Sequence, residues 1–174
     1  MAKVSLIKLG LKVNQDVKYV ECNGQVIEVK QYLPVNDKLE LIGNVINSAH
    51  DDNNFSNPVK VSIFTVLEIL YIYTNINFTE KQKEDPAKLY DLVVSSGLVD
   101  TVLDAIPEDE YEEIICGVED SIEAIYTYRN SVMGILDSVS TDYSNLNLDA
   151  ETIRKDLADP NNLTLLKDVL AKLG

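Results

Sequence analysis

The stretch from Pro107 to Thr141 constrains the fold of this chain more than any other part of the sequence. Proline suits the first turn of a helix, and Glu108, Asp109 and Glu110 then place negative charge at the positive end of the helix dipole. A single helix of this length would be on the order of 50 Å long, which exceeds the width of a compact domain of this size. We therefore expect one long helix around residues 107–141, serving as the spine of a helical bundle or as a rod that projects towards a partner.

An apolar seam runs along the predicted long helix, because apolar residues recur at alternating steps of four and three. The seam consists of Tyr111, Ile115, Val118, Ile122, Ile125, Arg129, Val132, Leu136 and Val139, and it is widened by Ile114, Tyr126 and Met133. This heptad-like spacing is typical of a helix that packs against another helix. Arg129 interrupts the seam. Either its aliphatic carbons pack in the seam while its guanidinium pairs with an acid, or the residue sets the register and the choice of partner. Gly134 would tolerate a bend in the helix.

Acidic residues dominate the charge of the chain. It carries 29 Asp and Glu against 15 Lys and Arg, a net charge of −14, and residues 89–128 contain eleven acids and no base. Such a chain should repel nucleic-acid phosphates and anionic membranes, so we expect it to bind neither directly. The acids of the predicted long helix, including Glu112, Glu113, Glu119 and Glu123, form either a solvated face or a surface for a basic partner.

A β-hairpin is the clearest local prediction near the N-terminus. Two β-branched runs flank Asn23-Gly24, a dipeptide that favours a type I′ turn because both residues can adopt a positive φ. We expect residues 17–22 to pair with residues 25–32. A two-stranded hairpin is marginal alone, so either a preceding strand at residues 4–13, with a possible kink at Gly10, adds a third strand, or the hairpin lies on the helices.

The remainder of the chain predicts helices, several of which begin at an Asx-Pro pair that supplies both an N-cap and a first helical residue. Asp37 with Glu40 fits a capping box, with Leu39, Ile42 and Val45 on the apolar face. Beside the long helix, the expected helices are 37–49, 58–75 (for which a strand is the alternative), 86–96, 98–106, 149–158 and 160–173, with a short capped turn at 79–85. The predicted fold is α+β and mostly α-helical: a single domain, 1–174, with a β element at 1–34 and a bundle of six or seven helices at 35–174.

The residues needed for catalysis or metal binding are sparse. His50 is the one histidine, and neither Cys22 nor Cys116 has a histidine or second cysteine at ligand spacing. The loop at residues 50–54 lacks the glycine and distal glutamate of a calcium site, so a plain turn is expected there. No apolar run reaches the length of a membrane span. We expect no catalytic, cofactor-binding or metal-binding residues, no cofactor, and a soluble protein that is not an enzyme.

The N-terminal module, VKYVECNGQVIEVKQYLP followed by NDKLELIGNVI, resembles the start of small acidic morphogenesis proteins of tailed phages that infect Gram-positive bacteria. Tail assembly chaperones are the nearest class to this N-terminal module. The C-terminal part, SVMGILDSVSTDYSNLNLDAETIRKDLADPNNLTLLKDVLAKLG, is similar in style to phage virion proteins. The resemblance covers about a third of the chain and carries no functional residue over. It implies a non-enzymatic protein that binds the hydrophobic tape measure during tail assembly or is built into the virion.

Two functions follow as expectations. The first is a phage morphogenesis or virion structural protein that contacts other phage proteins as a homo- or hetero-oligomer, in the host cytoplasm or in the virion. Its partner-binding surface would comprise the seam from Tyr111 to Leu136 and the four glutamates named above. The alternative is a small acidic inhibitor of a host defence or nucleic-acid-binding protein that acts as a nucleic-acid mimic. Only the mimic should lose its binding at high salt.

Overall fold

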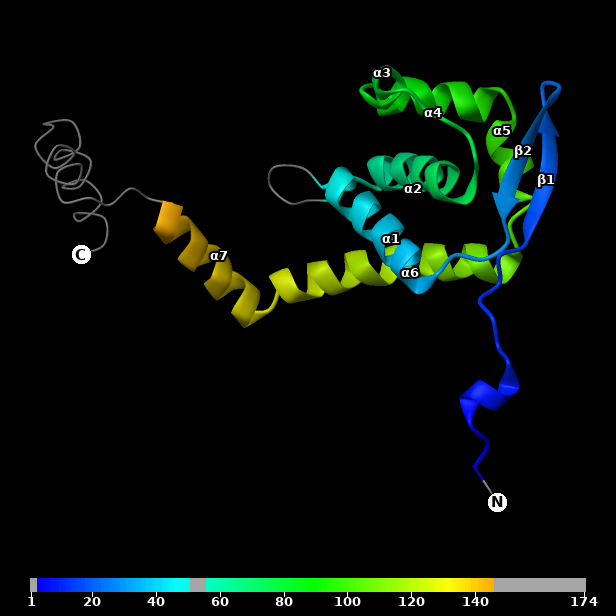
Figure 1. The fold of residues 1–174 in the computed structure, drawn as a ribbon. Helices are drawn as coiled ribbons and strands as arrows, with labels where there is room; N and C mark the ends of the chain where they lie inside the picture. Colours follow the sequence, from blue (N-terminus) through cyan, green and yellow to red (C-terminus); the bar gives the residue numbers. More distant parts are fainter. Residues whose placement is uncertain (1–2, 51–55, 146–174) are drawn as a thin grey trace, which may run out of the picture. The chain divides into compact units, whose positions relative to one another are not determined.

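The computed structural model describes residues 3–50 and 56–145, and the chain divides into two compact units, residues 1–125 and 126–174 (Figure 1). The strands are β1 (Val17–Cys22) and β2 (Gln25–Lys30). The helices are the 3₁₀ turn η1 (Leu6–Leu9), α1 (Val35–Ala49), α2 (Pro58–Tyr73), α3 (Glu80–Lys83), α4 (Pro86–Ser95), α5 (Leu98–Leu103), α6 (Glu108–Arg129) and α7 (Val132–Asn145). The fold is thus α+β and mostly helical, as predicted. The single-domain organisation stays a prediction.

The hairpin of β1 and β2 confirms the reading of Asn23-Gly24. Both turn residues have positive φ, 51° and 75°, and the strands pair antiparallel from Cys22↔Gln25 to Val17↔Lys30. One face of β2 is buried through Ile27 and Val29, so the hairpin lies on the helices of the first unit. This was the second of the two arrangements expected for it. β2 ends at Lys30, two residues earlier than predicted.

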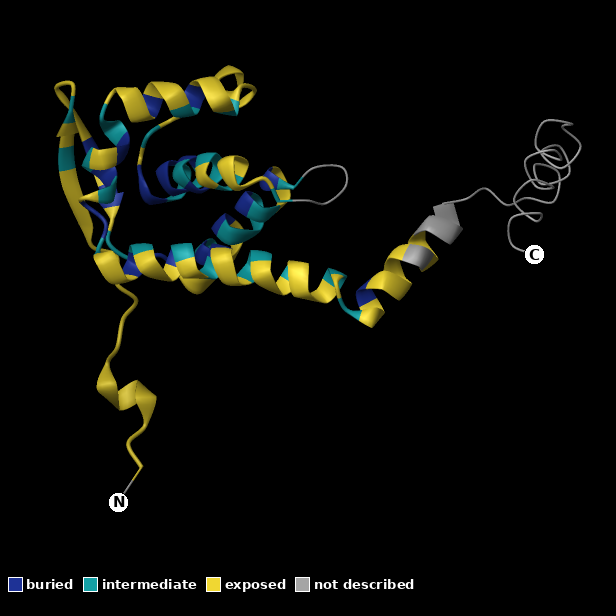
Figure 2. Cartoon of the chain, turned by 180° about the vertical axis from the view of Figure 1, so that it is seen from behind, coloured by how far each residue is buried: buried dark blue, intermediate teal, exposed yellow. Residues whose placement is uncertain are grey.

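The predicted strand at residues 4–13 is wrong. These residues belong to an N-terminal arm, residues 3–13, which contains η1 followed by Gly10 in the left-handed region at φ 61°. Every residue of the arm is exposed, and the sheet in the described part of the chain has two strands (Figure 2). A strand forms only when a neighbour accepts its backbone hydrogen bonds, and no described segment of this chain lies beside the arm to do so.

The core of the first unit lies between the hairpin and α1, α2, α4, α5 and α6 (Figures 1 and 2). Helix α2 is the central one, as its apolar composition indicated, and it buries Leu67, Leu70 and Tyr73 almost completely. Its N-cap Asn57 accepts hydrogen bonds from two backbone N–H groups of the first turn, as predicted. Thr79 likewise caps α3. No helix in the described ranges is both long and apolar enough to cross a membrane.

Helix α1 begins three residues earlier than the predicted capping box. Its N-cap is Pro34, which makes no side-chain cap, and Asp37 lies inside the first turn. Its buried face is accordingly formed by Lys38, Leu41, Val45 and Ala49, whereas Leu39 is exposed. The prediction placed Val45 on this face correctly, but it also placed the exposed Leu39 there and missed Lys38 and Leu41.

The predicted single helix at residues 107–141 is also wrong, because two residues separate α6 from α7. Asn130 donates from its side chain to the Tyr126 carbonyl (2.9 Å), and the Ser131 hydroxyl oxygen accepts from the N–H of Gly134 (3.1 Å). The Tyr126 carbonyl also accepts the last helical bond from the Asn130 N–H (3.1 Å), and the Ser131 hydroxyl caps the first turn of α7. A Cβ atom on Gly134 would collide with the carbonyl of Tyr128, so glycine permits the turn. The helices expected at 149–158 and 160–173 lie outside the described residues.

Candidate functional site

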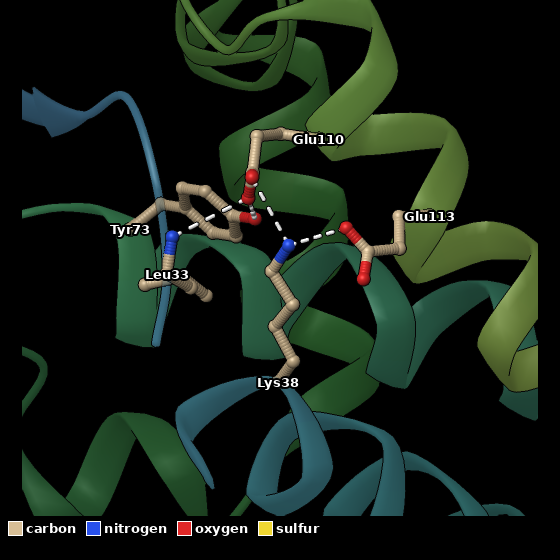
Figure 3. A network of polar contacts seen from close by, with 5 residues as sticks. All are labelled: Leu33, Lys38, Tyr73, Glu110 and Glu113. Atoms are coloured by element: carbon tan, nitrogen blue, oxygen red, sulfur yellow. Dashed lines mark hydrogen bonds and ion pairs between the residues drawn. The ribbon is translucent and has the colours of Figure 1, made fainter. Parts of the chain in front are cut away.

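The most connected polar site in the first unit is the Glu110 cluster, which comprises Leu33, Lys38, Tyr73, Glu110 and Glu113 (Figure 3). One carboxylate oxygen of Glu110 accepts a hydrogen bond from the Lys38 ammonium at 3.0 Å. The other accepts from the backbone N–H of Leu33 at 3.3 Å and from the Tyr73 hydroxyl at 3.2 Å. The ammonium of Lys38 also donates to Glu113 at 2.5 Å.

The Glu110 cluster joins four parts of the first unit. Lys38 projects from the buried face of α1, Tyr73 ends α2, and Leu33 lies between β2 and α1. Glu110 and Glu113 occupy the first turns of α6. The site therefore holds the start of α6 to two helices and to the segment that leaves the hairpin.

Burial makes the Lys38–Glu110 ion pair the central interaction of this site. The side chains of Lys38 and Glu110 are 8% and 11% exposed, whereas that of Glu113 is 62% exposed. Burial alone lowers the pKa of Lys38, but its hydrogen bonds to Glu113 and Glu110 outweigh this and raise the pKa above its ordinary value. Burial, together with the charge of Glu110, raises the pKa of Tyr73. Among the described residues no buried side-chain nitrogen or oxygen lacks a hydrogen-bond partner. The buried polar groups of the cluster are therefore all hydrogen-bonded, and their role is structural.

These pKa shifts predict a loss of stability in alkali. Unfolded Tyr and Lys release their protons near pH 10.0 and 10.5, whereas folded Tyr73 and Lys38 retain theirs to higher pH. The folded state then binds more protons, so the free energy of unfolding falls as the pH rises from about 10 through the folded pKa values. Urea unfolding between about pH 8 and about pH 11 should show a steeper decline for the wild type than for Tyr73→Phe. An equal decline of the free energy of unfolding with pH in the two proteins would contradict the raised pKa of folded Tyr73.

The predicted seam is split between α6 and α7 in the structure. The seam residues that belong to the first unit lie on α6, against the core. Val118 is buried at 2% exposure, and Tyr111 and Ile122 are half-buried against the core cluster. Ile115 and Ile125 are half-buried. Five seam residues of α6 thus lie on or beside the face that packs within the chain, and their role in partner binding stays a prediction.

The second unit carries the exposed part of the seam. Val132 and Leu136 are 75% and 57% exposed, and Met133 and Ile135 beside them are 63% and 54% exposed (Figure 2). We call these four residues the α7 apolar surface. Arg129, at the end of α6, is half-buried. The side chain of Val139 lies outside the described part of the structure.

The predicted acidic residues of α6 are at the surface. Glu112, Glu119 and Glu123 are exposed, as is Glu113, but Glu113 is engaged by Lys38. Three of the four glutamates therefore present carboxylates to solvent, and the fourth contributes to the Glu110 cluster.

The sequence reasoning missed Lys38, Tyr73 and Glu110 as a site. One signal was present: Lys38 is in phase with Leu41 and Val45, so a lysine stands on the apolar face of a helix. A buried lysine needs an anionic partner, and α6 is rich in acidic residues that can act as one.

His50 has protein partners at both ring nitrogens. Its Nδ1 lies 2.5 Å from the Ile46 carbonyl and its Nε2 lies 3.2 Å from the Ser56 hydroxyl. Residues 51–55 of the loop beside it lie outside the described residues. Within the described ranges no group of three or more His, Cys, Asp or Glu residues could hold a metal ion.

No protein-family model, curated protein or solved structure matches the chain.

Proposed function

We propose that this chain is a non-enzymatic bacteriophage morphogenesis or virion structural protein that acts through protein–protein contacts, as a tail assembly chaperone or a head or tail component. The observation that carries the proposal is the α7 apolar surface. Four large apolar side chains of one 14-residue helix are each more than half exposed, and spacings of three and four residues place them on one side of that helix. Full burial of such a side chain contributes about 1.5–3 kcal/mol, so a partner that covers this surface gains substantial free energy.

The partner proposed for the α7 apolar surface is another phage structural or assembly protein that offers an apolar helix or groove. An amphipathic helix binds such a groove through residues spaced three and four apart, as Val132, Ile135 and Leu136 are. In this proposal the protein acts in the host cytoplasm during assembly, and it remains in the virion if the contact persists. No cofactor takes part in this proposal.

The proposal predicts that charge on the α7 apolar surface stops assembly. Val132→Lys together with Leu136→Lys, introduced into the gene in its native phage genome, should reduce the yield of infectious particles by at least about tenfold, because each lysine would have to be buried unpaired in the contact. Particle titre and electron micrographs of the lysate measure the effect. Since both side chains are more than half exposed, the fold should survive, and circular dichroism of the purified variant checks this.

The matched control adds the same two charges elsewhere, at Leu39 of α1 and Leu92 of α4, which are 63% and 57% exposed. Leu39→Lys with Leu92→Lys should leave the yield near that of the wild type. A normal yield from the Val132→Lys, Leu136→Lys phage would contradict the proposal, and so would an equal loss from the control.

The exposed carboxylates of α6 favour a second candidate, an acidic inhibitor that imitates nucleic acid. Glu112, Glu119 and Glu123 are all accessible to a basic partner. Binding of this kind draws its free energy from charge and weakens steeply with salt. Replacing the three residues with glutamine should abolish inhibition by a mimic, whereas it should leave particle yield unchanged if the chain is an assembly protein.

A further inference from the structure

We propose that the N-terminal arm of one copy of this chain adds as a third strand to the outer edge of β1 in a second copy. Unlike the proposed function, this inference does not rest on the α7 apolar surface. It rests on two observations in the first unit: an open sheet edge, and an arm whose apolar side chains are unburied.

The outer edge of β1 is open. In a hairpin with a two-residue turn, the pair beside the turn, Cys22↔Gln25, is hydrogen-bonded, and hydrogen-bonded pairs then alternate with pairs that are not hydrogen-bonded. The backbone N–H and C=O groups of Val17, Tyr19 and Glu21 therefore face away from β2. The bond from the Gln31 N–H to the Asp16 carbonyl (3.0 Å) follows the same alternation. Within the described residues nothing accepts or donates along this edge.

The outer edge of β2, by contrast, is already covered. The N–H of Asn75 donates to the Glu28 carbonyl at 3.3 Å, and the N–H of Glu28 donates to the Asn75 side-chain oxygen at 3.1 Å. Val29 and Thr74 form a further antiparallel bridge. The two edges of the hairpin therefore differ, and β1 is the one left for an added strand.

Burial shows the same asymmetry. On the inward face of the hairpin, Ile27 and Val29 of β2 are 7% and 0% exposed, whereas Val20 and Cys22 of β1 are only half-buried. A strand placed beside β1 would cover the exposed part of these two side chains. The inward face of the hairpin is thus less covered at β1, where the edge is open, than at β2.

The arm has the composition of the missing strand. Its large apolar side chains are all more than half exposed, and they are Val4, Leu6, Ile7, Leu9, Leu11 and Val13. Leu9, Leu11 and Val13 alternate as strand residues do. The turn η1 is one short 3₁₀ segment that buries no residue, so little opposes its conversion to an extended strand.

The arm is basic in an acidic chain. Residues 1–15 contain Lys3, Lys8 and Lys12 and no acid, whereas the whole chain has a net charge of −14. The hairpin that would receive the arm carries two lysines and two glutamates, so its own charge is balanced. Two copies that exchange arms use both open edges and form a closed pair.

Light scattering on the full chain tests the inference. The wild type should have at least twice the mass of one chain, 19.4 kDa, and Leu9→Lys with Leu11→Lys should return it to the mass of one chain. Both leucines are more than half exposed, so the fold does not depend on them. The control Leu39→Lys with Leu92→Lys carries the same charge and should keep the wild-type mass. A single-chain mass for the wild type, or an unchanged mass for the arm variant, would overturn the inference.

Cross-linking between two variants locates the contact. In a background with Cys22→Ser and Cys116→Ser, one chain carries Leu11→Cys and the other Tyr19→Cys, and a short thiol–thiol cross-linker is added to the mixture. A covalent heterodimer is expected, and replacing Tyr19→Cys with Val59→Cys, at another exposed site, should reduce its yield at least about tenfold. Equal yields from the two mixtures would show that the arm does not lie along β1 of another copy.

Discussion

Replacing Lys38 with methionine is expected to lower the free energy of unfolding by about 3–5 kcal/mol, because it leaves the carboxylate of Glu110 buried without its cation. The side chain of Glu110 is 11% exposed and cannot turn to solvent as the 62% exposed side chain of Glu113 can. Domains are commonly stable by about 5–15 kcal/mol, so this loss would be a large share of the total. Urea unfolding followed by circular dichroism measures it.

Two controls separate the ion pair from the general effect of losing a lysine. Lys88→Met, at an exposed position of α4, should change the free energy of unfolding by less than about 0.5 kcal/mol. Adding Glu110→Gln to Lys38→Met should recover most of the loss, because the neutral amide still accepts from the Leu33 N–H and the Tyr73 hydroxyl. If Lys38→Met behaves like Lys88→Met, the Glu110 cluster does not hold α6 in place.

The second large effect is expected at Ile114, on the face of α6 that packs within the chain. Ile114 is 1% exposed, so Ile114→Ala removes apolar contacts and leaves a cavity, which should cost about 2–5 kcal/mol. Leu136→Ala, at a residue of α7 that is 57% exposed, should cost less than about 0.5 kcal/mol.

Comparison of these two variants by urea unfolding tests the division of the seam. If the seam were one continuous partner-binding stripe, both substitutions would be tolerated by the isolated protein. A small loss for Ile114→Ala, similar to that for Leu136→Ala, would contradict the packing of α6 described above.

Local signals in the sequence predicted the elements that depend on few neighbours. Asn23-Gly24 specified the hairpin because its turn needs two residues with positive φ, and Asn57-Pro58 specified the start of α2 because it supplies both a cap and a first helical residue. These features act within a few residues, so no knowledge of the tertiary fold was needed to find them.

The features that the sequence did not reveal depend on distant or competing interactions. The apolar periodicity continues across Asn130 and Ser131, yet side-chain bonds to the backbone end the helix there. The pairing of Lys38 with Glu110 joins residues 72 positions apart, and one sequence alone does not indicate which acid a buried lysine meets. The strand predicted at residues 4–13 has the right composition, but its neighbour is missing from the described part of a single chain.

The central claim is that this chain works through apolar contacts with other protein chains, and the solution mass of the purified protein at low and high salt tests it most directly. Light scattering at about 0.05 M and about 1 M salt should give the same discrete assembly, heavier than one chain of 19.4 kDa, because salt screens charge but does not weaken apolar contacts. The mass of a single chain at both salt concentrations would contradict self-assembly through apolar contacts, and an assembly that dissociates at high salt would contradict the apolar character of the contacts.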